Sequence, residues 1–223
     1  MRDLNIIYRL CENETDGNLR DIRPEWFNKI SCLQSFLNSV QFSEKLVNSV
    51  TFVHDGNEGP LLNYINQSGW GHRVIKVQHK DNLKSLISTF DIADGLDNDI
   101  YFVEDDYLHL PDSITKIAQS IGELELLSPY DHLACYDPVK YIGQPRQIED
   151  HRITTVANHL WKVNEFSCHT YSITRELFDK NKEIIMSDDC SRADITFYRT
   201  MHSRGYPLWG PNPAIATQVD TYM

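Results

Sequence analysis

The chain has 223 residues and carries 21 lysines and arginines against 32 aspartates and glutamates, a formal net charge of −11. This length is enough to bury a sizeable core, and we expect one domain. The acidic balance is opposite to that of a nucleic-acid-binding surface, so we expect no nucleic-acid partner. A phosphate-bearing small molecule is still compatible with it, because a bound metal ion can reverse the local charge of an acidic cleft.

The cysteines and the hydropathy pattern indicate the cellular compartment of the protein. Its five cysteines are odd in number, dispersed and without a CxxC pair, which argues against a disulfide framework or a zinc ribbon. They are typical of free thiols in a reducing compartment. No apolar run approaches the roughly 20 residues that span a bilayer, and the chain shows no secretory segment. We therefore expect a soluble, cytoplasmic protein without a transmembrane segment.

Strand and helix patterns alternate in the first part of the chain. An apolar strand over residues 5–9 is followed by a polar loop over residues 12–23 and by a helix that begins near Pro24. One apolar stripe marks this helix: Trp26, Ile30, Leu33, Leu37 and Val40. Residues 50–53 and 74–77 predict the next two strands. A second helix then follows, with apolar positions at Leu83, Leu86, Ile87 and Phe90.

Three consecutive acids come directly after the next strand. Residues 100–103 predict a buried strand, and Glu104, Asp105 and Asp106 stand where it meets solvent. Strands of open α/β sheets present ligand-binding residues at their carboxyl ends, and clustered carboxylates suit Mg²⁺ or Mn²⁺ with a phosphate ligand. A polar strand end before the turn at residues 110–112 explains the same acids without a ligand. This segment alone leaves both interpretations open.

The second part begins with a helix capped by Asp112 or Ser113. Its apolar face consists of Ile114, Ile117, Ile121 and Leu124. Residues 130–160 predict a long, partly irregular excursion of the kind that holds acceptor sites. A strand over residues 166–173 follows, then a helix from the cap Thr174 to about Ile185 and a last helix from the cap Ser191 to Gly205. The alternation predicts an α/β fold.

Asp194 lies in the first turn of the last predicted helix. If Ser191 is the cap, Asp194 is at the third helical position, where the positive helix end keeps a carboxylate ionised. The carboxylate then belongs either to a capping box that only stabilises the turn or to a general base that faces a cleft. Spacing alone favours the capping box.

The order of these motifs resembles the inverting, family-2-like nucleotide-sugar glycosyltransferases of the GT-A fold. The resemblance covers most of the chain and rests on four segments: Phe-Val-His-Asp55-Gly, Tyr-Phe-Val-Glu-Asp-Asp106, residues 168–175, and Asp194 followed by Arg199 and residues 205–211. It implies a single three-layer α/β domain over residues 1–223 with a mostly parallel central sheet. It also implies a nucleotide-sugar-binding half in residues 1–110 and an acceptor-binding half in residues 111–223.

The resemblance also implies roles for individual residues. Asp106 would bind Mn²⁺ or Mg²⁺ directly, and Asp194 would deprotonate the acceptor hydroxyl, with inversion of the sugar. Asp55 would recognise the base of a UDP- or GDP-sugar, and the rest of this donor would be bound by Arg9, Glu104 and Asp105. The acceptor would be a carbohydrate or glycoconjugate. Ala193 departs from the family's Glu-Asp pair, and no histidine follows His202 where some relatives place a metal ligand.

Two other functions remain open. A nucleotidyltransferase that makes the activated sugar would carry a Gly-rich, basic phosphate loop after its first strand, whereas the segment after Arg9 is acidic and has only Gly17. A non-catalytic nucleotide-sugar-binding domain is the third alternative, which fold likeness alone does not decide.

Isolated histidines and aromatic residues also have two interpretations each. His109 or His169 could assist the metal and His54 could approach the site, although hydrogen-bonded positions are commoner for single histidines. Some aromatic rings could stack on sugars, although core packing is their commoner fate: Tyr136, Trp161 and Trp209.

Overall fold

The computed structural model describes residues 3–12, 23–69, 71–131, 133–137, 139–140, 145, 147–187 and 194–219. Its strands are β1 (Leu4–Cys11), β2 (Val47–Asp55), β3 (Arg73–Val77), β4 (Asp99–Glu104), β5 (Tyr107–His109), β6 (Leu126–Leu127), β7 (Ile153–Val156), β8 (His159–Asn164), β9 (Tyr171–Ile173), β10 (Leu208–Asn212) and β11 (Ala216–Gln218). Its α-helices are α1 (Lys29–Phe42), α2 (Pro60–Gln67), α3 (Asn82–Asp94), α4 (Ser113–Leu124), α6 (Arg175–Ile185) and α8 (Asp194–Ser203). Two short 3₁₀ turns are η2 (Glu44–Leu46) and η3 (Leu133–Cys135).

Nine of these strands form one sheet in the order β3-β2-β1-β4-β9-β6-β10-β8-β7. β1 pairs in parallel with β2 and β4, and β2 pairs in parallel with β3. Only β9 and β8 run against the other strands of this sheet. The predicted α/β fold with a mostly parallel sheet is therefore confirmed. After β1, the chain adds β2 and β3 on one side of this strand and then places β4 on its other side. The carboxyl ends of β1 and β4 therefore form a topological switch point.

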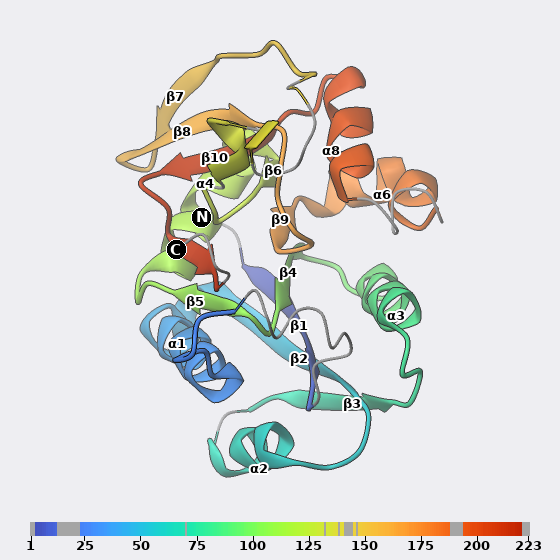
Figure 1. The fold of residues 1–223 in the computed structure, drawn as a ribbon. Helices are drawn as coiled ribbons and strands as arrows, with labels where there is room; N and C mark the ends of the chain where they lie inside the picture. Colours follow the sequence, from blue (N-terminus) through green and yellow to red (C-terminus); the bar gives the residue numbers. More distant parts are fainter. Residues whose placement is uncertain are drawn as a thin grey trace.

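Helices cover both faces of the sheet and make three layers (Figure 1). Successive side chains of a strand point to opposite faces, so Ile6 and Tyr8 of β1 pack with apolar residues of α1, α2 and α4. Ile7 points to the other face, where it belongs to the cluster formed with α3, α6 and α8. Both clusters are closed to solvent, which explains the nearly continuous apolar run of β1.

The first helix begins later than predicted. The side chain of Asn28 accepts a hydrogen bond from the backbone N–H of Ile30 at 2.8 Å, so α1 starts at Lys29 and not near Pro24. Trp26 lies outside the helix with 59% of its surface exposed and does not belong to the apolar stripe. The stripe from Ile30 to Val40 packs against the sheet as predicted.

Several short elements differ from the prediction or were not predicted. α2 has eight residues, too few to show an apolar period. The strand expected over residues 166–173 is limited to Tyr171–Ile173. β7 and β8 form a hairpin that begins in the excursion and extends to Asn164, through a two-residue turn in which Ala157 and Asn158 both have positive φ. Such turns are usually marked by glycine, which this one lacks.

Capping was predicted correctly for one helix and incorrectly for another. The Thr174 hydroxyl accepts from the backbone N–H of Leu177 at 3.2 Å and caps α6. At α4 neither Asp112 nor Ser113 caps with its side chain. The hydroxyl of Ser39 on α1 accepts from the N–H of Ile114 instead, at 3.2 Å. An acceptor supplied by another helix leaves no local sequence pattern.

Within the described part of the chain, no helix has the length and apolarity needed to cross a bilayer.

Candidate functional site

The carboxyl ends of β1, β2 and β4 open into one cavity of about 200 Å³. Five of the residues predicted for the site lie in its wall, because the parallel register places the ends of these strands side by side. The lining residues are Arg9, Leu10, Cys11, Arg23, Lys29, Asp55, Asn82, Ser85, Glu104, Asp105, Asp106, Cys168, His169 and Gln218.

Arg9 and Glu104 form the first ion pair of the cavity. They are register partners on β1 and β4, and the guanidinium donates to both carboxylate oxygens, at 3.1 Å from Nε and 2.6 Å from Nη2. Arg9 also donates to the backbone oxygen of Asn82 at 3.0 Å, which connects β1 to the start of α3. Burial raises the pKa of Glu104 to about 7, although Arg9 opposes this shift.

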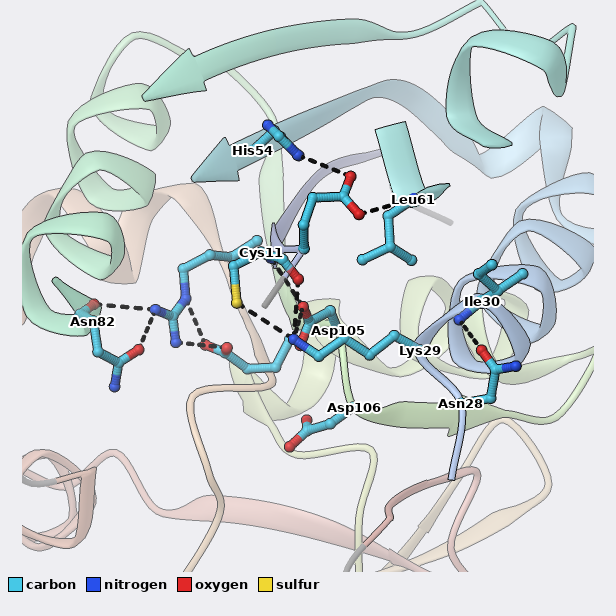
Figure 2. A network of polar contacts seen from close by, with 12 residues as sticks. Cys11, Asn28, Lys29, Ile30, His54, Leu61, Asn82, Asp105 and Asp106 are labelled. Carbon is cyan, nitrogen blue, oxygen red and sulfur yellow. Dashed lines mark hydrogen bonds and ion pairs between the residues drawn. The ribbon is translucent and has the colours of Figure 1, made fainter. Parts of the chain in front are cut away.

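Asp105 is paired with Lys29, the first residue of α1. Its Oδ2 accepts from Lys29 Nζ at 2.9 Å and from the backbone N–H of Cys11 at 3.0 Å. Figure 2 shows Lys29 and Cys11 converging on this carboxylate beside Asp106. Burial alone would lower the pKa of Lys29, but the charges and hydrogen bonds of Asp105 and Cys11 together outweigh it, and the pKa is raised.

Asp106 has the most buried carboxylate of the three acids. Its Oδ2 accepts from Arg23 Nη2 at 2.9 Å and from Gln218 Nε2 at 3.0 Å. Gln218 arrives on β11, which pairs with β5 directly after the acids. Burial raises the pKa of Asp106, with a further contribution from the neighbouring charge of Asp105. Each of the three acids is thus matched by one basic side chain.

The remaining oxygen of Asp106 tests whether a divalent ion fits here. Oδ1 is buried and receives no hydrogen bond from the described residues. A hard cation can be held by one or two carboxylates together with substrate phosphates and water, so this oxygen fits Mg²⁺ or Mn²⁺. No group of three histidine, cysteine or acidic side chains among the described residues surrounds a common point. The residues therefore fit an ion whose other ligands come from the substrate or water.

Asp55 ends β2 and is buried at the cavity wall. Its Oδ1 accepts from the backbone N–H groups of His79 and Lys80, at 3.0 and 3.2 Å. These bonds orient the carboxylate and leave Oδ2 without a donor from the described residues. A fixed carboxylate with one available acceptor oxygen can bind a ring N–H of a nucleobase.

The three histidines have different surroundings. His109 is buried in the core, where its Nε2 and the Tyr101 hydroxyl are 2.8 Å apart. His54 is also fully buried, 3.1 Å from Glu12, whose carboxylate accepts from the first N–H groups of α2. His169 lines the cavity, where burial and the charge of Arg9 lower its pKa to about 3. Of the three, His169 alone lines the cavity.

α8 is described from Asp194 onward; the side chain of Asp194 and the predicted cap Ser191 lie outside the described residues. Farther along this helix, Arg199 pairs with the buried carboxylate of Glu165. Glu165 also accepts from the backbone N–H of Ile148 at 3.2 Å. This pair fastens α8 to the end of β8 and to the excursion.

The segment 168–175 is divided between opposite ends of the sheet. Cys168 and His169 line the cavity, whereas Arg175 binds the carbonyl oxygens of Ala93 and Leu96 at the end of α3, at 2.7 and 2.9 Å. The Arg175 backbone N–H donates to Asp99 at the start of β4, which is the end away from the acids. Arg175 is thus a helix-capping residue outside the cavity.

The aromatic residues are also divided. Trp161 and Trp209 are buried in the core and offer no exposed ring. Tyr136 is 60% exposed, and its hydroxyl donates to Asp131 at 2.6 Å. Its ring faces the ammonium of Lys162, with 3.6 Å between Nζ and the ring centre.

Sequence reasoning missed five polar residues of the cavity wall: Arg23, Lys29, Asn82, Ser85 and Gln218. No motif marks them. Arg23 lies in the segment between the first strand and the first helix, where only the acidic character was apparent, and Lys29 is the first residue of that helix.

Comparison with known proteins identifies the fold. No family model and no curated protein sequence matches this chain. The solved structure of S. aureus TarS 1-349 matches with a TM-score of 0.53 at 13% identity, over 93% of this chain and 57% of that one. A nucleotidyl transferase from Methanothermobacter matches with a TM-score of 0.51 at 12% identity, over 93% and 86% of the two chains. Rv0371c from Mycobacterium tuberculosis has a TM-score of 0.50 at 12% identity, over 94% and 87%.

These likenesses show that the chain has a GT-A-like α/β fold. The chain spans less than two thirds of the TarS structure. Identities this low define the fold alone, so the activity must be argued from the cavity.

Proposed function

We propose that the protein is a glycosyltransferase that moves a sugar from a nucleotide-sugar donor to a hydroxyl acceptor, with inversion. One observation carries this proposal: Arg9, Asp55 and the three acids meet in one cavity at the carboxyl ends of β1, β2 and β4. In open α/β sheets this is the position at which ligands bind. Residues 1–110 would supply most of the donor site and residues 111–223 the acceptor site.

The donor would be held from both ends. Asp55 Oδ2 would accept a ring N–H of the base, and both uracil and guanine offer one, so UDP- and GDP-sugars are both candidates. Glu104 and Asp105 would orient the ribose or the sugar. Arg9 would act through Glu104, which it holds by two hydrogen bonds.

Asp106 would hold Mn²⁺ or Mg²⁺ through Oδ1. When bound, such an ion neutralises the charge that develops on the departing diphosphate. The chain's own contribution is to hold this carboxylate in place through Arg23 and Gln218.

Asp194 would accept the proton of the attacking hydroxyl, as a general base on the first turn of α8. Attack from the face opposite the leaving diphosphate inverts the anomeric carbon. A carbohydrate or glycoconjugate would supply the hydroxyl, and Tyr136 is an exposed ring in the proposed acceptor half on which a sugar could stack.

A nucleotidyltransferase is the second candidate, and one observation favours it. Arg23 and Lys29 follow the first strand and reach the cavity, where a nucleotidyltransferase would place its phosphate-binding bases. The chain after the first strand is acidic overall, but it supplies these two basic side chains to the cavity.

Phosphorus NMR distinguishes the two reactions. The protein is incubated with nucleotide sugars and Mn²⁺ in the presence of carbohydrate acceptors, and separately with nucleoside triphosphates and sugar phosphates. A glycosyltransferase releases nucleoside diphosphate from the first mixture, and a nucleotidyltransferase releases pyrophosphate from the second. Thermal-shift measurements select the donor beforehand, since a specific ligand raises the melting temperature by mass action. If no nucleotide sugar bound or reacted, the glycosyltransferase proposal would fail.

A further inference from the structure

The cavity wall contains basic side chains as well as acids. Among its described lining residues, three are basic, Arg9, Arg23 and Lys29, and four are acidic. The guanidinium of Arg9 is committed to both oxygens of Glu104. Arg23 and Lys29 each contact a single oxygen of their aspartate, and Lys29 also donates to the backbone oxygen and the sulfur of Cys11.

Both of these side chains are held in place yet reachable from the cavity. Arg23 donates to the backbone oxygen of Val219 at 3.0 Å and stacks on Phe27, with 4.2 Å between its Cζ and the ring centre. Lys29 donates to the backbone oxygen of Cys11 at 3.0 Å. Their side chains remain 12% and 13% exposed.

We propose that Arg23 and Lys29 bind the diphosphate group of the donor. This inference rests on the proposed function and deepens it, because it assigns phosphate ligands that no motif marks. Asp105 and Asp106 hold the two cations at the cavity wall before the donor binds. The diphosphate then draws the cations away from these single-oxygen contacts, while Gln218 continues to hold Asp106. A phosphate is a stronger partner than one carboxylate oxygen, since it offers several charged acceptors to a guanidinium or ammonium group.

A simpler role would be charge neutralisation alone. In that case Lys29 only compensates Asp105, and Arg23 only compensates Asp106, so that the acids do not repel an anion. The two roles make opposite predictions for double variants. Removing a cation together with its acid restores the charge balance but not a contact with phosphate.

Isothermal titration calorimetry with inorganic pyrophosphate separates the two roles. The titration is made in EDTA at low ionic strength, so that the chain's own cations are measured without a divalent ion. We expect K29M and R23M each to weaken binding by about tenfold or more, because each loses a charged hydrogen bond. K116M is the matched control, since Lys116 pairs with Asp112 at 3.0 Å on α4, outside the cavity wall.

The double variants K29M/D105N and R23M/D106N decide between contact and neutralisation. If the cations contact phosphate, both double variants remain at least about tenfold weaker than the wild type. Recovery of wild-type affinity in the double variants would overturn the proposal. So would unchanged affinity in the single variants, or no pyrophosphate binding by the wild type.

Two further measurements control for misfolding of the variants and for the charge of Lys29. Thermal unfolding of every variant shows that it is folded, and K29R, which retains the charge, should recover most of the binding lost in K29M. A titration with nucleotide sugars distinguishes this proposal from the proposed function. If pyrophosphate binds through Lys29 and Arg23 but no nucleotide sugar binds, the function is wrong and the phosphate site stands. If nucleotide sugars bind equally well to K29M and R23M, the function stands and the phosphate site is wrong.

Discussion

Arg9 and Glu104 are register partners at the carboxyl ends of the adjacent parallel strands β1 and β4, and two hydrogen bonds of 3.1 and 2.6 Å join them. The pair neutralises the first of three consecutive acids. It also ties the two central strands together at the cavity, with side chains only 12% and 16% exposed.

Replacing Arg9 alone should therefore destabilise the fold. R9M leaves the Glu104 carboxylate without its cation, and we expect the unfolding free energy to fall by about 3 kcal/mol. R9M/E104Q removes both charges and should recover most of this loss. Urea unfolding measures both variants against the wild type. Equal losses in the single and double variants would show that the pairing itself contributes little.

Asp55→Asn should weaken nucleotide binding selectively. The asparagine can keep its oxygen toward the N–H groups of His79 and Lys80, but an amide NH₂ replaces the acceptor offered to the base. We expect UDP or GDP to bind about tenfold more weakly or worse, with pyrophosphate binding unchanged. Calorimetry with both ligands checks this. Wild-type affinity of D55N for nucleoside diphosphates would remove Asp55 from base recognition.

Asp106→Asn tests the proposed metal ligand. The neutral amide loses the charge that attracts a divalent ion, so the increase in melting temperature caused by Mn²⁺ with a nucleoside diphosphate should largely disappear. D99N is the control, because Asp99 lies at the opposite end of the same strand. An equal Mn²⁺ response in D106N and wild type would contradict the metal assignment.

Asp194→Asn tests the proposed base. Loss of the proton acceptor should lower turnover by about 100-fold or more while donor binding is kept. If the carboxylate only caps α8, stability should fall by about 1 kcal/mol and turnover per folded molecule should hardly change. Melting temperature and turnover measured on one preparation separate these results. NMR of the first-formed product is independent of the variant: retention of the anomeric configuration would exclude Asp194 as the base for direct displacement.

His109 should make stability depend on pH on the acidic side. Burial lowers its pKa from 6.5 to about 4, so between these values the folded chain binds fewer protons than the unfolded chain. The unfolding free energy should therefore suffer no loss from protonation of His109 above pH 6.5, and it should fall as the pH drops toward 4. H109Q can keep the hydrogen bond to Tyr101 without titrating, and should show a shallower slope in urea unfolding. Parallel slopes would mean that His109 does not contribute.

Local sequence patterns determined much of the layered fold and part of the cavity. The apolar run of residues 100–103 ends at three acids. This pattern alone places the acids at the carboxyl end of a strand, where α/β sheets bind ligands. The spacing of Ile114, Ile117 and Ile121 predicted α4, and Thr174 predicted the start of α6, because periodicity and capping are properties of neighbouring residues.

The tertiary structure alone decided which charges meet. Lys29 reaches Asp105 across 76 positions of sequence, Arg23 reaches Asp106 across 83, and Gln218 returns to the same carboxylate from 112 positions away. An ion pair depends only on where two side chains end in space, so separation along the chain carries no signal for it. For the same reason, the sequence did not predict that Arg175 caps α3 or that Arg199 pairs with Glu165. Sequence by itself located the acids, and the packing of distant segments supplied their cations.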